Sequence, residues 1–386
     1  MKFKTMLKSS VATAAILAVA VPVVSSQAQA GIANGNDNAL TVSGHINRSL
    51  IYADDGSREE LFHVDGGTAN SRMRFVVSGS LTEQVSMGAL HEMNMITGVD
   101  AGAFDFDGAG TVDKDQRNIQ DWAARQSNVA FTHKAAGKLT IGKSTQVDNN
   151  ATSAWGGNNF GTGGLNHSGG MTFVRTSTPG TVSTVTASSA FGMYDAGRGD
   201  QIRYDLPGGL PISAGIAYED MGVWTVGGSW GGSFSGIGVK LTYAHSNVSA
   251  NSTALDYTQH ISMALSHSSG LGLVARWGEE SAKVVDSTDD QATGQAFEGE
   301  GRMIGLSYQT KGITSLGSSH FRVTYGENDD SLEKGDSSER MGISYVQKMP
   351  AGTSMHIGYE EAEYETLTIS DYQDVSSIIA GVMVAF

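Results

Sequence analysis

Apolar side chains occupy every second position in the last eleven residues of the chain, Ser376–Phe386. This alternation is typical of a β-strand with one apolar face. A second segment near the start of the chain, Leu40–Tyr52, alternates in the same way. An open sheet would leave such strands with unpaired backbone groups, whereas a closed barrel pairs the first strand with the last. We therefore expect an all-β fold, a transmembrane antiparallel β-barrel that begins and ends with these two segments.

Sixteen segments alternate between apolar and polar residues in this way. Most have the nine to eleven residues that a tilted strand needs to cross the apolar layer of a membrane. In chain order they are Leu40–Tyr52, Arg72–Leu81, Val85–Met95, Arg125–His133, Lys138–Ser144, Asp200–Leu206, Pro211–Glu219, Gly222–Trp230, Gly236–His245, Asp256–His267, Leu271–Glu279, Arg302–Thr310, Ser319–Glu327, Glu339–Lys348, Thr353–Glu361 and Ser376–Phe386. The pattern predicts a wall of sixteen strands.

The connections between these segments alternate between short turns and long loops. Thr82–Gln84 and Pro207–Leu210 are short, whereas Ile96–Ala124 and Thr145–Gly199 are long and rich in polar residues. Short turns on one side and long loops on the other are typical of barrels of the bacterial outer membrane.

The second face of the same strands is polar and carries charges such as those of Arg74 and Arg203. A charged side chain facing lipid near the membrane midplane costs about 2–4 kcal/mol, so this face is expected to line a wet interior. Arg48 is the exception, because it falls in phase with the apolar face of its strand. Either a bulge shifts the register at Arg48 or its side chain meets a neighbouring subunit.

Residues 1–30 have the pattern of a secretory signal peptide. Three lysines precede the apolar stretch Val11–Val24, and Ala28–Ala30 forms an A-x-A cleavage sequence. We expect cleavage before Gly31, which leaves 31–386 as the barrel. The whole chain has 25 basic and 40 acidic residues and no cysteine. This balance argues against nucleic acid as a partner, and the composition provides neither disulfides nor thiolate metal ligands.

The hairpin Arg125–Ser144 contains the sequences V-A-F and G-K-L-T-I-G-K. It resembles the hairpin before the constriction loop in general diffusion porins of Gram-negative bacterial outer membranes. Gln201–Pro207 (QIRYDLP) is similar to the strand with which those porins re-enter the wall, and Phe386 resembles their terminal aromatic residue. The chain departs from the pattern at Lys143, where porins more often have arginine, and at Ala136, which replaces an aromatic residue.

The resemblance implies a homotrimer in the cell outer membrane, in contact with lipid and lipopolysaccharide. It also implies that the barrel-assembly machinery reads Phe386. The segment from Thr145 to Gly199 would be the long third loop, folded into the pore as a constriction loop. Without the resemblance, Met171–Ser177 and Thr181–Phe191 could be two more wall strands, which would make eighteen.

Porins place basic residues on the wall of a narrow waist, opposite acidic residues of the inserted loop, and such fixed charges act strongly on passing ions. Arg125 matches the porin motif, and Arg74 and Arg203 are wall candidates from the polar face. Asp148 and Asp195 are the acidic residues of the loop. Each aspartate could instead be a solvated turn residue.

These features predict a passive water-filled channel for small hydrophilic solutes and ions, which is not an enzyme and needs no cofactor. The alternative is a substrate-specific eighteen-stranded channel for a sugar or an anion, and a barrel adhesin or an outer-membrane enzyme has less support. Gly227–Gly231 matches the nucleophile motif G-x-S-x-G, but that motif needs a strand-to-helix turn and here it ends a strand. Acidic residues crowd the long loops and predict a weak preference for cations, which arginines at the waist would oppose.

Asp105–Gln116 partly matches a twelve-residue calcium loop. Asp105, Asp107 and Asp113 stand at ligand positions, but Gln116 replaces the bidentate glutamate that completes such loops. The sequence therefore predicts, at most, weakly bound calcium, with millimolar affinity. The alternative is an acidic, solvated loop tip.

Overall fold

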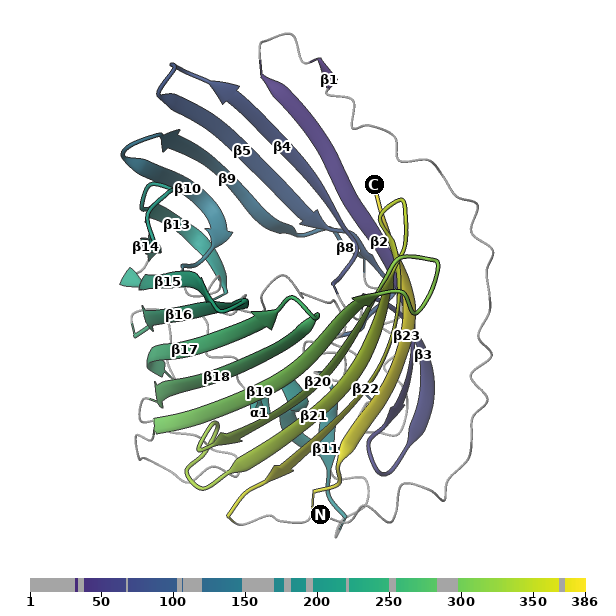
Figure 1. Cartoon of the computed structure of the whole chain (residues 1–386). Helices are drawn as coiled ribbons and strands as arrows, with labels where there is room; N and C mark the ends of the chain where they lie inside the picture. The colour runs from purple at the N-terminus through teal and green to yellow at the C-terminus, as the bar shows by residue number, and fades with distance from the viewer. Residues whose placement is uncertain are drawn as a thin grey trace.

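The computed structural model describes residues 32–33, 38–66, 69–102, 106, 120–147, 170–176, 182–191, 197–219, 222–249, 255–282, 298–367 and 372–386. Sixteen antiparallel strands form a closed barrel (Figure 1). Around the wall they are β2 (Ala39–Asp54), β4 (Arg72–Ser80), β5 (Val85–Asn94), β9 (Ala124–His133), β10 (Gly137–Thr145), β13 (Arg198–Asp205), β14 (Ile212–Glu219), β15 (Trp224–Phe234), β16 (Ile237–Asn247), β17 (Leu255–His267), β18 (Leu271–Ala282), β19 (Glu298–Lys311), β20 (Ser318–Asp329), β21 (Ser337–Lys348), β22 (Thr353–Glu365) and β23 (Val375–Ala385). Each corresponds to one of the sixteen segments expected from the sequence, so the predicted strand number is confirmed.

Several short strands accompany the wall. β1 (Ile32–Ala33), β3 (Glu59–Asp65) and β7 (Val99–Asp100) extend the same sheet, and β6 (Ile96–Thr97) pairs with β8 (Gln120–Asp121). β11 (Thr172–Val174) and β12 (Val182–Thr186) pair with each other in a separate two-stranded sheet. The two segments that could have made eighteen wall strands therefore form a hairpin of their own.

The barrel closes between its first and last strands. His45 of β2 pairs with Ala385 of β23, and the register continues to Asp54 and Ser376. Beyond this register, Gly44 and Phe386 exchange two backbone hydrogen bonds of 2.9 Å. A Cβ atom at position 44 would collide with the Phe386 ring, so glycine is required for the terminal residue to close the ring.

The other edge of β2 is shared by two strands. Its first half pairs with β4, and its second half, from Arg48 onward, pairs with β3. Arg48 and Asp65 are cross-strand partners in this second half, with Arg48 Nη1 3.1 Å from Asp65 Oδ2 and 2.7 Å from the carbonyl oxygen of Thr97. The charge of Arg48 is thus satisfied within its own chain, and neither a bulge nor a neighbouring subunit is needed to explain its position.

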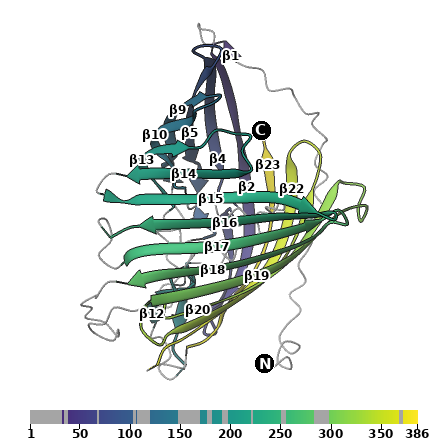
Figure 2. The same ribbon diagram turned by 60° about the vertical axis from the view of Figure 1, so that its left-hand side comes forward.

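The two faces of the wall differ as the alternation predicts. On β21, Met341 and Ile343 are 41% and 55% exposed, whereas Arg340 and Ser344 on the opposite face are buried. The strands β13–β20 run side by side along one part of the wall (Figure 2). Among the described residues, no helix is long and apolar enough to cross a membrane.

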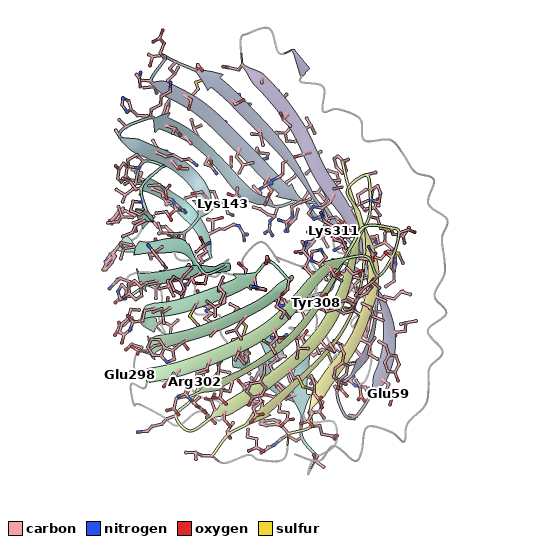
Figure 3. All side chains as sticks on the ribbon, in the orientation of Figure 1. Glu59, Lys143, Glu298, Arg302, Tyr308 and Lys311 are labelled. Carbon is pink, nitrogen blue, oxygen red and sulfur yellow. The ribbon has the colours of Figure 1, made fainter. Side chains whose placement is uncertain are left out.

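β19 crosses the wall from one rim of the barrel to the other (Figure 3). Glu298 lies at its long-loop end, and Lys311 lies at its short-turn end, with Tyr308 close by. An aromatic residue near the end of a membrane-crossing strand is typical of the aromatic girdles of such barrels.

An apolar cluster lies on the face of the wall opposite the exposed apolar residues. It joins Ile51 of β2 and Ile379 of β23 to Met171, Phe173 and the short helix α1 (Ala187–Ala190). Ile51, Ile379, Met171 and Phe173 are all fully buried. The wall strands that close the barrel are therefore packed against residues from the segment between β10 and β13.

Candidate pore constriction

Three arginines surround one buried glutamate on neighbouring strands. Arg74 of β4 lies directly across from Glu92 of β5, and its Nε is 2.6 Å from Glu92 Oε2. Arg125 Nε of β9 is 3.0 Å from Glu92 Oε1, and Arg72 Nη1 of β4 is 3.6 Å from the same oxygen. The Glu92 side chain is only 1% exposed. We call these four residues the Glu92 cluster, and its local net charge is positive.

A β-bulge brings Arg125 into the cluster. Glu92 pairs with Gln126, but the next residue, Met93, pairs with Ala124, so Arg125 is an extra residue with no partner of its own in the ladder. Such an extra residue bends the strand and changes the direction of its side chain. The Arg125 guanidinium also donates to Asn94 Oδ1 at 3.3 Å. Strict alternation would not have placed Arg125 beside Glu92.

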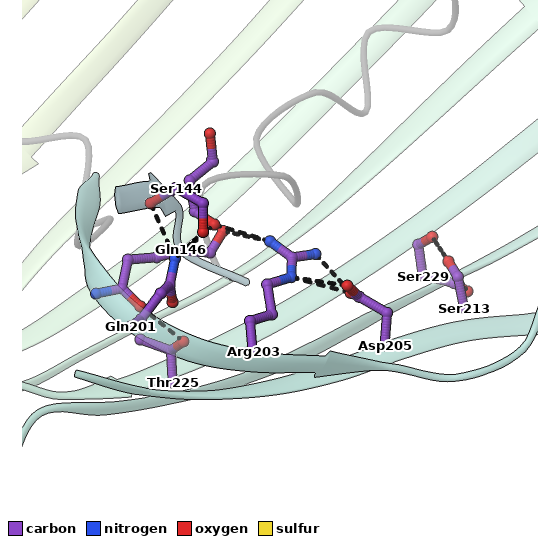
Figure 4. A network of polar contacts seen from close by, with 9 residues as sticks. Ser144, Gln146, Gln201, Arg203, Asp205, Ser213, Thr225 and Ser229 are labelled. Atoms are coloured by element: carbon purple, nitrogen blue, oxygen red, sulfur yellow. Dashed lines mark hydrogen bonds and ion pairs between the residues drawn. The ribbon is translucent and has the colours of Figure 1, made fainter. Parts of the chain in front are cut away.

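Arg203 belongs to a second polar network, on β13 (Figure 4). Its guanidinium contacts the Asp205 carboxylate at 2.6 Å and donates to the carbonyl oxygens of Thr145 and Gln146 at 2.9 and 3.2 Å. The positive charge of Arg203 is thus neutralised by Asp205, and its remaining donors hold the chain where it leaves β10.

The chain that leaves β10 continues across the inner face of the neighbouring strands. Gln146 is buried and accepts a hydrogen bond of 3.1 Å from Thr225 of β15. Gln201 donates to the carbonyl oxygens of Ser144 and Thr145, both at 2.9 Å. A Cβ atom at Gly227 of β15 would lie 3.1 Å from Val147 Cγ1, so the absence of a side chain there makes room for this segment.

Phe173, Ala190 and Phe191, from the same segment of the chain, contact a different part of the wall. Phe173 packs on Tyr364 of β22 with ring centroids 5.4 Å apart, and Ser338 Oγ of β21 donates to the Ala190 carbonyl at 2.7 Å. Phe191 lies against Gly326 of β20, where a Cβ atom would collide with its ring. The guanidinium carbon of Arg340 is 5.9 Å from the centroid of the same ring.

The structure therefore brings together two of the three predicted wall arginines, Arg74 and Arg125, and places Arg203 in a separate network. The predicted acidic residues Asp148 and Asp195 lie outside the described residues. The same holds for the predicted calcium ligands, Asp105, Asp107 and Asp113, so calcium binding stays a prediction.

The two acidic partners, Glu92 and Asp205, were not predicted from the sequence. Each had a signal in the sequence. Glu92 is the only acidic residue in Val85–Asn94, and Asp205 follows Arg203 by two residues and so shares its face of the strand.

A sequence profile of Gram-negative porins matches residues 12–367. The chain belongs to the Gram-negative porin family. This porin accordingly resides in the outer membrane, where its barrel forms a passive channel. No curated protein matches the chain.

Solved porin structures share the fold at low sequence identity. The anion-selective porin from Comamonas acidovorans is 14% identical, with a TM-score of 0.59 over 91% of this chain and all of that one. The outer membrane channel DcaP of Acinetobacter baumannii is 11% identical, with a TM-score of 0.55 over 92% of this chain and all of that one. OmpF of Salmonella typhi, solved with daunomycin, is 11% identical, with a TM-score of 0.53 over 90% of this chain and 98% of that one.

Proposed function

We propose that the segment from Thr145 to Gly199 crosses the channel and forms its waist. The observation that carries this proposal is the position of its described ends. Gln146 and Val147 lie on β13–β15, and Phe173, Ala190 and Phe191 lie on β20–β23. Half the ring of sixteen strands separates β15 from β23, so a segment held at both places spans the lumen.

The Glu92 cluster is the charged wall of this waist. Its three guanidinium groups outnumber its one carboxylate, and charges at a narrow point with low-dielectric walls act most strongly on passing ions. The acidic long loops favour cations at the mouth, but they act where the channel is wide. The waist therefore gives the channel a preference for small anions, in contrast to the weak cation preference predicted from the loops. The structurally similar porin from Comamonas acidovorans is anion-selective, which supports the proposal.

The function includes no catalytic step. The G-x-S-x-G match at Gly227–Gly231 lies inside β15, and no helix follows it. Ser229 shares a hydrogen bond of 2.7 Å with Ser213 of the neighbouring strand. A nucleophile elbow needs a tight turn between a strand and a helix, and Ser229 is instead part of a regular antiparallel pair.

The active unit is a homotrimer. Each strand from β13 to β22 contains a tyrosine or tryptophan, whereas β4, β5, β9 and β10 contain neither. These residues mark the lipid headgroup level in barrels, so their absence from four consecutive strands fits a sector covered by another subunit. One of the similar solved structures, OmpT of Vibrio cholerae, is described as a trimer form.

Assembly follows the route of an exported barrel. Residues 1–30 are removed during export, and the barrel-assembly machinery reads Phe386 before that residue closes on Gly44. The lipid-facing strands then contact outer-membrane lipid and lipopolysaccharide.

Planar-bilayer recording of the purified protein tests this function. We expect large, ohmic current steps in groups of three and a reversal potential that shows anion preference in a tenfold salt gradient. A cation-selective reversal potential would contradict the role of the Glu92 cluster, and single steps from a protein that stays monomeric on native gels would contradict the trimer.

A further inference from the structure

A cavity of about 460 Å³ lies on the inner face of the wall at the short-turn end of β14–β17. Its polar lining comes from Lys240 and from the hydroxyls of Ser213, Ser229 and Ser266. These side chains occupy the face opposite the exposed apolar residues Ile212, Trp230 and Leu241, so the cavity opens to the channel and not to lipid.

The cavity exists because small residues surround Lys240. Gly231 and Ala264 are its two cross-strand neighbours, on β15 and β17. A Cβ atom at Gly231 would have no neighbour closer than the Val239 carbonyl oxygen, at 3.9 Å. The ammonium group of Lys240 is therefore not crowded by the side chains beside it on the wall.

Lys240 differs from the arginines of the Glu92 cluster and from Arg203. The arginines near the waist share Glu92, and Arg203 is paired with Asp205. The cavity lining contains no acidic residue, and within the described part of the chain no carboxylate lies within ion-pair distance of Lys240. Its charge is therefore available to a solute.

The serine hydroxyls complement this charge. Ser213 Oγ and Ser229 Oγ lie 2.7 Å apart, and Figure 4 shows the pair beside the Arg203–Asp205 network on the same face. A hydroxyl group both donates and accepts hydrogen bonds, whereas an ammonium group only donates. Together they match a solute that carries one anionic group and several hydroxyl groups.

We propose that this cavity is a binding subsite for small polyhydroxylated anions, such as sugar acids, on the short-turn side of the waist. The proposal rests on the channel function, since a solute reaches the cavity through the lumen. The carboxylate pairs with Lys240, and the solute hydroxyls bond to the serines. The cavity volume is within the range of sites for small molecules, and its open side allows the solute to leave.

Gluconate and acetate distinguish this subsite from a general preference for anions, because both carry one carboxylate but only gluconate has hydroxyl groups. We expect gluconate, but not acetate, to reduce the single-channel current in a saturable way. Lys240→Met should weaken this block about tenfold, the loss expected for one charge-assisted hydrogen bond. Ser213→Ala combined with Ser229→Ala should weaken block by gluconate and leave the effect of acetate unchanged.

Lys311→Met is the matched control, because it removes the same charge from the exposed short-turn end of β19. Equal gluconate block in the Lys240→Met and Lys311→Met variants would overturn the subsite while leaving the channel intact. Saturation-transfer NMR of gluconate with the folded protein in detergent micelles provides a readout that does not need current. If the protein shows no conductance but Lys240→Met still weakens the gluconate NMR signal, the channel function is refuted and the site is retained. If Lys240→Met leaves the gluconate NMR signal unchanged, the site is refuted.

Discussion

Arg74 and Glu92 face each other across the β4–β5 pair, with Arg74 Nε 2.6 Å from Glu92 Oε2. Arg125 and Arg72 approach the other oxygen of the same carboxylate. The negative charge of Glu92 therefore keeps three guanidinium groups close together on the inner wall. The cluster is therefore both an electrostatic element and a structural one.

Glu92→Gln should increase the anion preference of the channel. The variant keeps the shape of the side chain but leaves three guanidinium groups without their shared counter-charge. We expect the reversal potential in a tenfold salt gradient to shift toward that of an ideal anion channel, with a larger shift at low salt because screening is weaker there. Glu83→Gln, in the short turn after β4, removes the same charge away from the cluster. If both variants shift the potential equally, the cluster does not set the selectivity.

Phe191→Ala should loosen the segment between β10 and β13. Phe191 is buried against Gly326, and truncation of a buried phenylalanine costs about 3–5 kcal/mol of packing. We expect higher conductance and more open-channel noise, because the segment is no longer held at β20. Gly326→Ala should have a similar effect, since its Cβ atom would collide with the Phe191 ring.

Gly231→Ala is the matched control for the variant of Gly326, because its Cβ atom on β15 would meet only the Val239 carbonyl oxygen, at an ordinary contact distance of 3.9 Å. If Phe191→Ala and Gly326→Ala both leave conductance and noise at the wild-type level, this contact does not hold the segment.

The turn between β20 and β21 should become more stable as the pH falls. Asp336 in this turn is buried, and burial raises its pKa above the ordinary value of 3.8 even though it accepts hydrogen bonds from the amides of Ser331 and Leu332. Between 3.8 and the raised pKa the folded state binds a proton that the unfolded state releases, so stability is gained as pH falls through this window and lost as pH rises.

Hydrogen exchange of the amides of residues 331–336, corrected for intrinsic rates, measures this effect. We expect stronger protection at about pH 4.5 than at neutral pH. In Asp336→Asn the baseline protection should fall, because one acceptor oxygen is lost, and the pH dependence should become flatter. A variant that keeps the wild-type dependence would assign the effect to a neighbouring carboxylate.

Ile343→Arg should destabilise the barrel by about 2–4 kcal/mol, the cost of an arginine facing lipid near the midplane. Ile343 lies in the middle of β21 on the exposed apolar face. Ser78→Arg, on the inner face of β4, should cost much less because its charge stays in water. Urea unfolding in lipid vesicles provides both values, and equal losses would mean that the two faces are wrongly assigned.

The strands could be predicted from the sequence because alternation with a period of two is a local property of each segment. The polar face could be predicted for the same reason, and it suggested Arg74 and Arg203, which the structure places on β4 and β13; their role at the waist stays a prediction. The hairpin motif added Arg125, although the bulge that turns Arg125 toward Glu92 leaves no signal that alternation alone can detect.

The remaining features depend on contacts between distant segments. β3 lies in a connection whose sequence is acidic and polar, so no strand was predicted there. Its pairing with β2 brings Asp65 to Arg48 and explains why an arginine is tolerated on the apolar face. Glu92 was not predicted because its role depends on contacts with arginines from the two neighbouring strands, β4 and β9. The sequence of its own strand does not show these contacts.

The pairing of β2 with β23 has a consequence for how the molecule is made. His45 and Ala385 are almost a full chain length apart, so the ring cannot close until synthesis and export are complete. Until then β2 lacks one of its neighbours, and an unpaired apolar strand is a site for aggregation. The contact that finishes the barrel is thus the slowest to become possible. The exported chain therefore carries an unpaired strand edge that the closed barrel no longer has.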